Sequence, residues 1–177
     1  MRTAILGHSQ IRSFEDYIVN RGIKEIISLC KPGAKFENFL NSITIRQLKE
    51  FNPELVVVVL GSNDIDHTRN AGQNKHQVIY LAINHFIDKI KSIGLNFTLR
   101  ILEIEPRMNC RICPSEYNLI RKAVNRKLHR KLREEFVFTY NQGIHEDSIG
   151  SDGVHFNSRG KQALRNVILK IIREHSK

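Results

Sequence analysis

Residues 54–61 read ELVVVVLG, a run of valines and leucines with no polar residue between Glu54 and Gly61. Such a run favours a strand that is buried on both faces, because a strand with one wet face would alternate apolar and polar residues. Strands of this kind are typical of parallel sheets that helices cover on either side. We therefore expect this segment to form a central strand of an α/β domain.

Apolar and amphipathic segments alternate along the rest of the chain, on both sides of this run. Parallel neighbouring strands need long crossover connections, which are usually helices, so the alternation predicts a three-layer α/β/α sandwich with a mostly parallel five-stranded sheet. After the third strand, the polar stretch 63–75 has the composition of a mobile loop. The expected strands are 3–7, 25–30, 54–61, 97–105 and 136–140, and the expected helices are 10–21, 36–51, 74–93, 116–134 and 158–174.

The bulk composition is that of an ordinary globular protein, with 41% apolar and 26% charged residues in a chain of 177. This length suits one domain, residues 1–177, which would bury about 70% of the surface that its unfolded chain exposes. No apolar stretch approaches the ~20 residues of a membrane helix, and no signal peptide is evident at the N-terminus. The 3 cysteines form no disulfide-rich pattern. We expect a cytoplasmic or nuclear protein.

Polar residues follow the expected strands at the points where ligands bind in open α/β sheets, beyond the carboxyl ends of the strands. Ser9 follows the first strand, Gly33 the second and Asn63 the third, while Asp152 and His155 lie in the loop after the fifth. Four separate segments thus bring a hydroxyl, a tight turn, an amide and an Asp/His pair to one edge of the sheet. We expect the functional site there.

These groups match the needs of acyl transfer. A serine hydroxyl needs a base to take its proton, and His155 could be that base for Ser9. A carboxylate on the other imidazole nitrogen fixes the tautomer, a role that suits Asp152. The side-chain amide of Asn63 and the backbone N–H groups of Gly33 and Ser9 are candidate donors to an oxyanion. The set predicts a serine hydrolase that needs no metal and no organic cofactor.

Four segments carry a resemblance to a known family. ILGHSQ (5–10), PGAKF (32–36), VLGSND (59–64) and DGVHFN (152–157) resemble, in order and spacing, the four sequence blocks of the SGNH hydrolases, also called the GDSL esterase/lipase family. The resemblance spans nearly the whole chain. It implies a flavodoxin-like α/β/α fold, the same roles for the five residues above, and cleavage of an ester or acetyl group through an acyl-serine intermediate. The implied substrate is a small-molecule, lipid or carbohydrate ester.

One position departs from the family pattern, because family members usually carry Asp before the serine and this chain carries His8. In the family that Asp is thought to help hold the active-site loops, so an imidazole in its place could loosen or rewire the site. If His8 only weakens this support, His8→Asp should keep or raise activity and thermal stability. A looser resemblance links YNLIRKAVNRKL (117–128) and SDGVHFNSRGKQAL (151–164) to SGNH domains in proteins encoded by animal LINE-type retrotransposons.

Each candidate residue also has a purely structural interpretation. Ser9 could cap the helix that follows it, Asn63 and Gly33 could be turn residues, Asp152 could form a turn with the next glycine, and His155 could be an ordinary loop histidine. The segment CRIC (110–113) has the spacing of half a zinc site, but no second cysteine pair completes four ligands. We therefore expect no metal site.

The formal net charge is +10, and the segment 121–133 is crowded with cations. Such a helix is either a solvated face or a patch for RNA, DNA or an anionic membrane surface. The second possibility leads to an alternative function, a catalytically weak or inactive SGNH fold used as a basic binding module. The oligomeric state has no signal in the sequence. The candidate anion-binding residues are Arg121, Lys122, Arg126, Lys127, Arg130 and Lys131.

Overall fold

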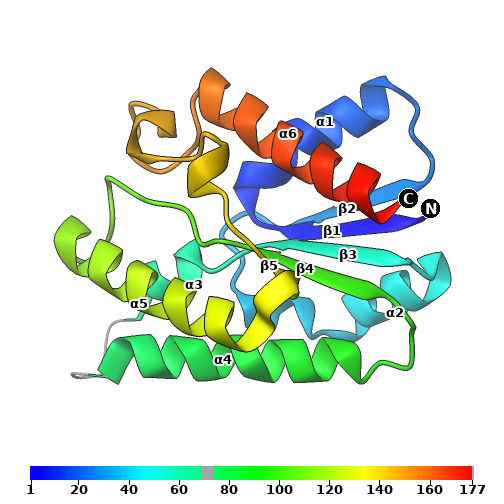
Figure 1. The fold of residues 1–177 in the computed structure, drawn as a ribbon, viewed down its shortest axis with the longest axis horizontal. Coiled ribbons are helices and arrows are strands. Elements are labelled where there is room, and N and C mark those ends of the chain that lie inside the picture. Colours follow the sequence, from blue (N-terminus) through cyan, green and yellow to red (C-terminus); the bar gives the residue numbers. More distant parts are fainter. Residues whose placement is uncertain (69–73, 177) are drawn as a thin grey trace.

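The valine-rich run forms β3 (Leu55–Val59), the middle strand of a five-stranded parallel sheet (Figure 1). The computed structural model describes residues 1–68 and 74–176. The strand order is β2-β1-β3-β4-β5, where β1 is Thr3–Gly7, β2 is Ile26–Cys30, β4 is Thr98–Leu102 and β5 is Phe136–Val137. All pairings are parallel, so the predicted sheet and fold class are confirmed.

Helices cover both faces of the sheet, as a parallel sheet requires (Figure 1). On one face lie α1 (Arg12–Asn20) and α6 (Ser158–His175). On the other face lie α2 (Ser42–Phe51), α4 (Lys75–Lys91) and α5 (Pro114–Leu132). Short 3-10 turns occur at Ser9–Ile11, Phe36–Phe39, Arg133–Glu135, Tyr140–Gln142 and Glu146–Ser148.

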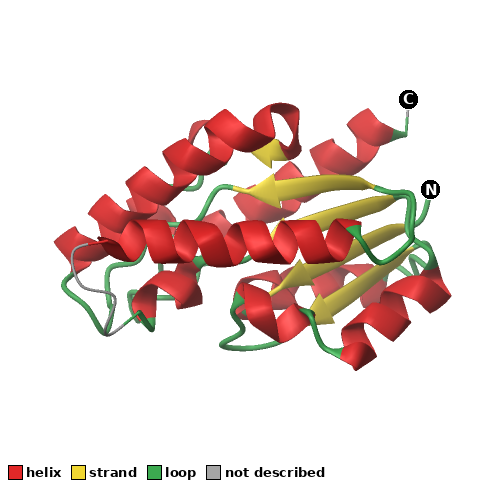
Figure 2. Cartoon of the chain, turned by 90° about the horizontal axis from the view of Figure 1, so that it is seen from below, coloured by secondary structure: helices red, strands yellow, loops and turns green. Residues whose placement is uncertain are grey.

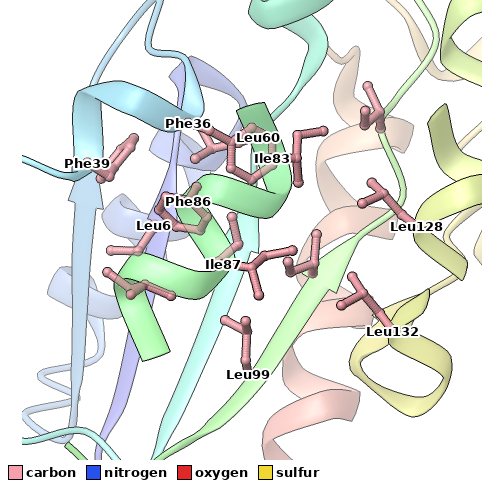
Figure 3. Packing of buried hydrophobic residues seen from close by; sticks show 14 of the residues in the cluster. Leu6, Phe36, Phe39, Leu60, Ile83, Phe86, Ile87, Leu99, Leu128 and Leu132 are labelled. Carbon is pink, nitrogen blue, oxygen red and sulfur yellow. The ribbon is translucent and has the colours of Figure 1, made fainter. Parts of the chain in front are cut away.

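Two apolar cores lie on either side of the sheet, because successive residues of a strand point to opposite faces. Leu6, Phe86 of α4 and Leu128 of α5 all belong to the first core (Figure 3). Ile5, the neighbour of Leu6 in β1, belongs to the second core with the α6 residue Ile168. The second core holds α1 and α6 against the sheet.

Two helical elements differ from the sequence prediction. The expected helix 36–51 is interrupted because Asn41 adopts extended backbone and its side chain accepts from the Thr44 N–H, which starts α2. The stretch predicted to begin a loop at 63 instead forms α3 (Ser62–Asp66). Residues 69–73 of the predicted loop 63–75 lie outside the described residues, and its mobility stays a prediction.

The last strand is shorter than expected, two residues instead of five. The Glu103 carboxylate accepts hydrogen bonds from the backbone N–H groups of Thr139 (3.0 Å) and Tyr140 (3.1 Å). These N–H groups therefore leave the strand ladder, and the chain turns away after Val137. An apolar pattern could not reveal this local competition for backbone donors.

All five strands run in the same direction, so their carboxyl ends meet at one edge of the sheet (Figure 2). The register places Gly7 of β1 beside Cys30 of β2 and Val59 of β3. The segments that follow these three residues therefore start side by side. This edge carries the candidate site.

Candidate active site

Ser9, His155 and Asp152 form a hydrogen-bonded line, although the first lies 146 residues before the second. Ser9 begins the 3-10 turn after β1, and its Oγ lies 3.0 Å from Nε2 of His155. Nδ1 of His155 lies 2.6 Å from Oδ2 of Asp152. The histidine and aspartate side chains are about half exposed, at 49% and 53%. The structure thus brings these three predicted residues together at an open surface.

The Asp152 carboxylate is held in its ionised form. Its Oδ1 accepts the N–H groups of Val154 and His155, both at 2.9 Å, within the turn that the sequence suggested. The hydrogen bond from Val154 is the largest cause, ahead of the imidazole of His155, of a pKa of about 2 for this carboxyl. An ionised carboxylate only accepts, so Nδ1 of His155 carries the proton. Nε2 is then the acceptor that faces Ser9.

The buried side chain of Gln10 joins the 3-10 turn Ser9–Ile11, here the serine turn, to the loop 152–157, here the histidine loop. The Nε2 of Gln10 donates to the carbonyl of Val154 (2.8 Å), and its Oε1 accepts from the N–H of Phe156 (3.0 Å). These two bonds grip the loop on either side of His155. Gln10 was not predicted as a site residue, and its place directly after Ser9 is the signal in the sequence that could have indicated it.

Asn63 is buried and oriented at both ends of its amide group. Its Nδ2 donates to the carbonyl of Ala34 (3.0 Å), and its Oδ1 accepts from Nη2 of Arg107 (2.7 Å). Because Nδ2 has two hydrogens, one remains for another acceptor. The contact with Ala34 brings Asn63 against the turn that contains Gly33.

Two glycines shape the backbone around Asn63. Gly33 has φ +72°, and its N–H donates to no other group in the described residues. Gly61 has φ +116°, and a Cβ there would lie 2.6 Å from the Ile104 side chain. Only glycine fits position 61, and this tight turn delivers Asn63 to the sheet edge directly after β3.

The imidazole of His8 is fully buried in a polar network. Its Nδ1 accepts from the N–H of Gln10 (3.4 Å), so Nε2 carries the proton. Nε2 lies 3.0 Å from Oγ of Ser62 and 2.9 Å from Oε1 of Glu105. The second contact has an ion-pair distance without hydrogen-bond alignment. His8 therefore ties the serine turn to the segments that follow β3 and β4.

Glu105 supplies the network with a buried carboxylate. Burial by itself would raise the pKa of Glu105, but the nearby His8 imidazole and Arg107 guanidinium outweigh it and lower the pKa to about 2. The family usually has a carboxylate directly before the serine, whereas this chain has His8 there. The carboxylate beside His8 comes instead from Glu105, in the segment after β4. We call this altered arrangement the rewired network.

Arg107 holds the other end of the network and was also missed in the sequence. Its guanidinium donates to Asn63, to Oγ of Ser62 (3.2 Å) and to Oδ2 of Asp66 (3.2 Å). The side chain is 5% exposed. One buried cation therefore fixes three residues of α3. The family pattern flags the asparagine but gives no sign of the arginine that orients it.

The basic helix α5 does not present all its predicted cations on one surface. Arg121 is buried and donates to the carbonyl of Ile104 and to Oδ1 of Asn118. Lys127 and Lys131 reach across to α4, where they bind Gln77 and Asn84. The exposed cations of the set are Lys122, Arg126, Arg130 and Lys131. Binding of nucleic acid or an anionic membrane surface there stays a prediction.

The cysteines of the CRIC segment differ in their surroundings. Cys110 is partly buried and Cys113 is exposed. Burial raises the pKa of the Cys110 thiol to about 11, so it stays protonated near neutral pH. Across residues 1–68 and 74–176, no three His, Cys, Asp or Glu side chains gather as metal ligands, and no helix is long and apolar enough to cross a membrane.

Comparison with known proteins agrees with this architecture. A family model described as GDSL-like lipase/acylhydrolase matches residues 6–168. A solved structure from Bacteroides fragilis has a TM-score of 0.74 and 20% identity, covering 99% of this chain and 88% of its own. A GDSL-like lipase from Bacteroides thetaiotaomicron has a TM-score of 0.71 and 17% identity, with coverages of 98% and 88%.

A third solved structure, a family 3 carbohydrate esterase of Clostridium thermocellum, has a TM-score of 0.67 and 16% identity, with coverages of 100% and 99%. No curated protein matches the sequence. At these identities the solved structures show a shared fold. The similarity to retrotransposon-encoded domains stays a prediction.

Proposed function

Because the chain belongs to the family of GDSL-like lipases and acylhydrolases, we propose that it is a serine esterase that cleaves an ester or acetyl group through an acyl-Ser9 intermediate. The observation that carries the proposal is the line from Ser9 through His155 to the ionised Asp152, with separations of 3.0 and 2.6 Å. This arrangement gives the serine a base in the correct tautomer. A helix cap or a loop histidine alone would not require it.

In the proposed reaction, Nε2 of His155 takes the proton of Ser9 Oγ as the oxygen attacks the ester carbonyl. The tetrahedral intermediate collapses, the alcohol leaves with the proton from Nε2, and the acyl group stays on Oγ. Water then repeats the sequence and releases the acid. Asp152 stays ionised throughout, because its pKa of about 2 lies far below the working pH.

The oxyanion of this intermediate needs donors that are already in place. The second hydrogen of Asn63 Nδ2 and the N–H groups of Gly33 and Ser9 are the candidates. Arg107 supports the first of them, because its bond to Oδ1 fixes which end of the amide carries the hydrogens. This fixed orientation would make Asn63 a donor without reorganisation during the reaction.

The nucleophile can be tested with Ser9→Ala and with Ser42→Ala as a matched control, since Ser42 is exposed on α2. Ser9→Ala should lower turnover of p-nitrophenyl acetate by about 10³-fold or more and abolish labelling by a fluorophosphonate, while the control keeps both. His155→Ala should lose activity to the same extent, because triad members act as a unit. A folded wild-type protein that neither hydrolyses short esters nor accepts the label would overturn the proposal.

A further inference from the structure

A groove leads away from Ser9 and His155 between the first turns of α1 and α6, which lie on the same face of the sheet (Figure 1). Its inner part is a hollow of about 300 Å³ lined by both of these residues and by Arg12, Asp16 and Lys161. The proposed reacting groups thus line a hollow whose walls carry charged side chains.

The outer part of the groove adjoins the inner part, because the two hollows share lining residues. A second hollow of about 210 Å³ shares Ser13 and Lys161 with the first and is also lined by Arg165. Ser158 and Gln162 line it as well, which adds a hydroxyl and an amide. A substrate with its ester at Ser9 could therefore place a second polar group in this neighbouring hollow.

Positive charge dominates this groove. Arg12, Lys161 and Arg165 line it, against a single carboxylate from Asp16. Within residues 1–68 and 74–176 none of these three cations forms an ion pair, whereas elsewhere other surface cations do, such as Lys91 with Glu135. Arg165 instead lies over the ring of Tyr17, 5.0 Å from its centre. Unpaired cations in a concave wall attract anions more strongly than the same cations on a flat surface.

We infer that this cationic groove, residues Arg12, Ser13, Lys161 and Arg165, binds an anionic group of the substrate, a carboxylate or a phosphate, and so selects anionic esters. The inference rests on the proposed esterase function, because it assigns the substrate class of that site. Arg12 and Lys161 line the inner hollow together with Ser9, so they hold the anion closest to the scissile bond. The carboxylate of Asp16 repels the anion and lowers the affinity of the groove for it.

Binding can be measured without turnover in the Ser9→Ala protein. The probes are 4-acetoxybenzoate, its neutral analogue 4-acetoxybenzamide and 4-acetoxyphenyl phosphate, and the measurement is a titration followed by NMR. The carboxylate should bind at least about fivefold more tightly than the amide, and the preference should shrink as salt is added. Comparing the affinities of 4-acetoxyphenyl phosphate and 4-acetoxybenzoate shows which of the two anions the groove prefers.

Charge variants in the same background locate the effect. Lys161→Gln and Arg12→Gln should each lower the preference for the carboxylate by about fivefold, and Asp16→Asn should raise it. Arg173→Gln is the matched control, because Arg173 is exposed on α6 about 18 Å from Lys161 along the helix axis. In the Ser9-containing protein, the ratio of kcat/KM for the two esters should follow the same order.

Equal binding of the carboxylate and the amide overturns the inference, as does an equal loss of preference in Arg173→Gln and Lys161→Gln, which would mean a general effect of net charge. Retained preference with no hydrolysis or labelling of the wild type would instead overturn the esterase proposal and the assignment of the anion to an ester substrate, while the groove would remain an anion-binding site. Hydrolysis without any preference for anionic esters would support the esterase proposal and overturn the proposed role of the groove in binding anions.

Discussion

The side chain of His8 is fully buried beside the ionised carboxylate of Glu105, and this neighbour determines what a substitution at position 8 does. From the family pattern alone, His8→Asp should restore a missing aspartate. The structure changes that expectation, because an aspartate would stand next to a second carboxylate at a position buried from solvent. Two adjacent buried carboxylates cannot both ionise without a large cost.

We expect His8→Asp to lower the free energy of unfolding by about 3–5 kcal/mol, because it leaves a buried carboxylate without a compensating partner. Adding Glu105→Gln should recover part of the loss, because it removes the second carboxylate. Thermal unfolding of both single variants and the double variant gives the coupling between the two positions. His85→Asp, at an exposed position on α4, serves as the control. A His8→Asp protein as stable as the wild type would contradict the rewired network.

The residues proposed to react were easier to find in the sequence than the residues that position them. Ser9 and His155 stand in short segments with a recognisable spacing, and the structure places them in contact. Gln10, Glu105 and Arg107 were not predicted, because each acts through a partner far away along the chain. Glu105 could be assigned only to a strand, since its partner His8 lies 97 residues earlier and no local pattern joins them.

Among the secondary-structure elements, those with long apolar or amphipathic patterns were predicted well, and those decided by single polar contacts were not. The strands β1, β2 and β3 follow the expected ranges to within two residues. The length of β5 depends on Glu103, and the start of α2 depends on the cap by Asn41. Hydrophobic periodicity contains no information about either contact.

Gln10 connects the serine turn to the histidine loop, and we expect this connection to hold His155 in position. Gln10→Ala removes both bonds that Gln10 makes to the loop and leaves the carbonyl of Val154 and the N–H of Phe156 without these partners. We expect kcat to fall by about 10–10²-fold with little change in KM, because small misplacement of a base is costly. Amide hydrogen exchange in residues 154–156 should become faster.

Gln47→Ala is the control, because Gln47 is exposed on α2 and makes no contact with the loop among the hydrogen bonds of the described residues. If amide exchange in the loop becomes faster in Gln10→Ala while kcat stays unchanged, the order of the loop does not affect catalysis. That result would contradict a positioning role for Gln10. An equal effect of the two variants on kcat would contradict it as well.

At the scale of the whole molecule, stability should depend on pH through the buried carboxyl groups, and these act in opposite directions. Burial raises the pKa of Asp64 to about 7, while the pKa of Glu105 is lowered to about 2. A group with a lowered pKa stabilises the fold above its ordinary pKa, and this stabilisation is lost as the pH falls towards 2. Asp64 behaves in the reverse manner, because the folded protein keeps a proton that the unfolded chain releases.

The contribution of Asp64 can be isolated with Asp64→Asn. Its Oδ1 accepts from the N–H of Phe36 (3.3 Å), a bond that asparagine keeps, while its Oδ2 has no hydrogen-bond partner in the described part of the chain. The unfolded carboxyl ionises near 3.8 and the folded one near 7. The wild type should therefore lose stability between these values as the pH rises, and the loss should level off above 7.

The two proteins should be similarly stable near pH 4, and the variant should become more stable by a margin that grows to at most about 4 kcal/mol at pH 8. Urea unfolding at several pH values measures this margin, and the acidic loss due to Glu105 cancels because both proteins share it. Asp88→Asn, at an exposed position on α4, should show no such growth. A margin for Asp64→Asn that stays constant from pH 4 to 8 would mean that the carboxyl is ionised throughout this range, contrary to its burial beneath the turn at Phe36.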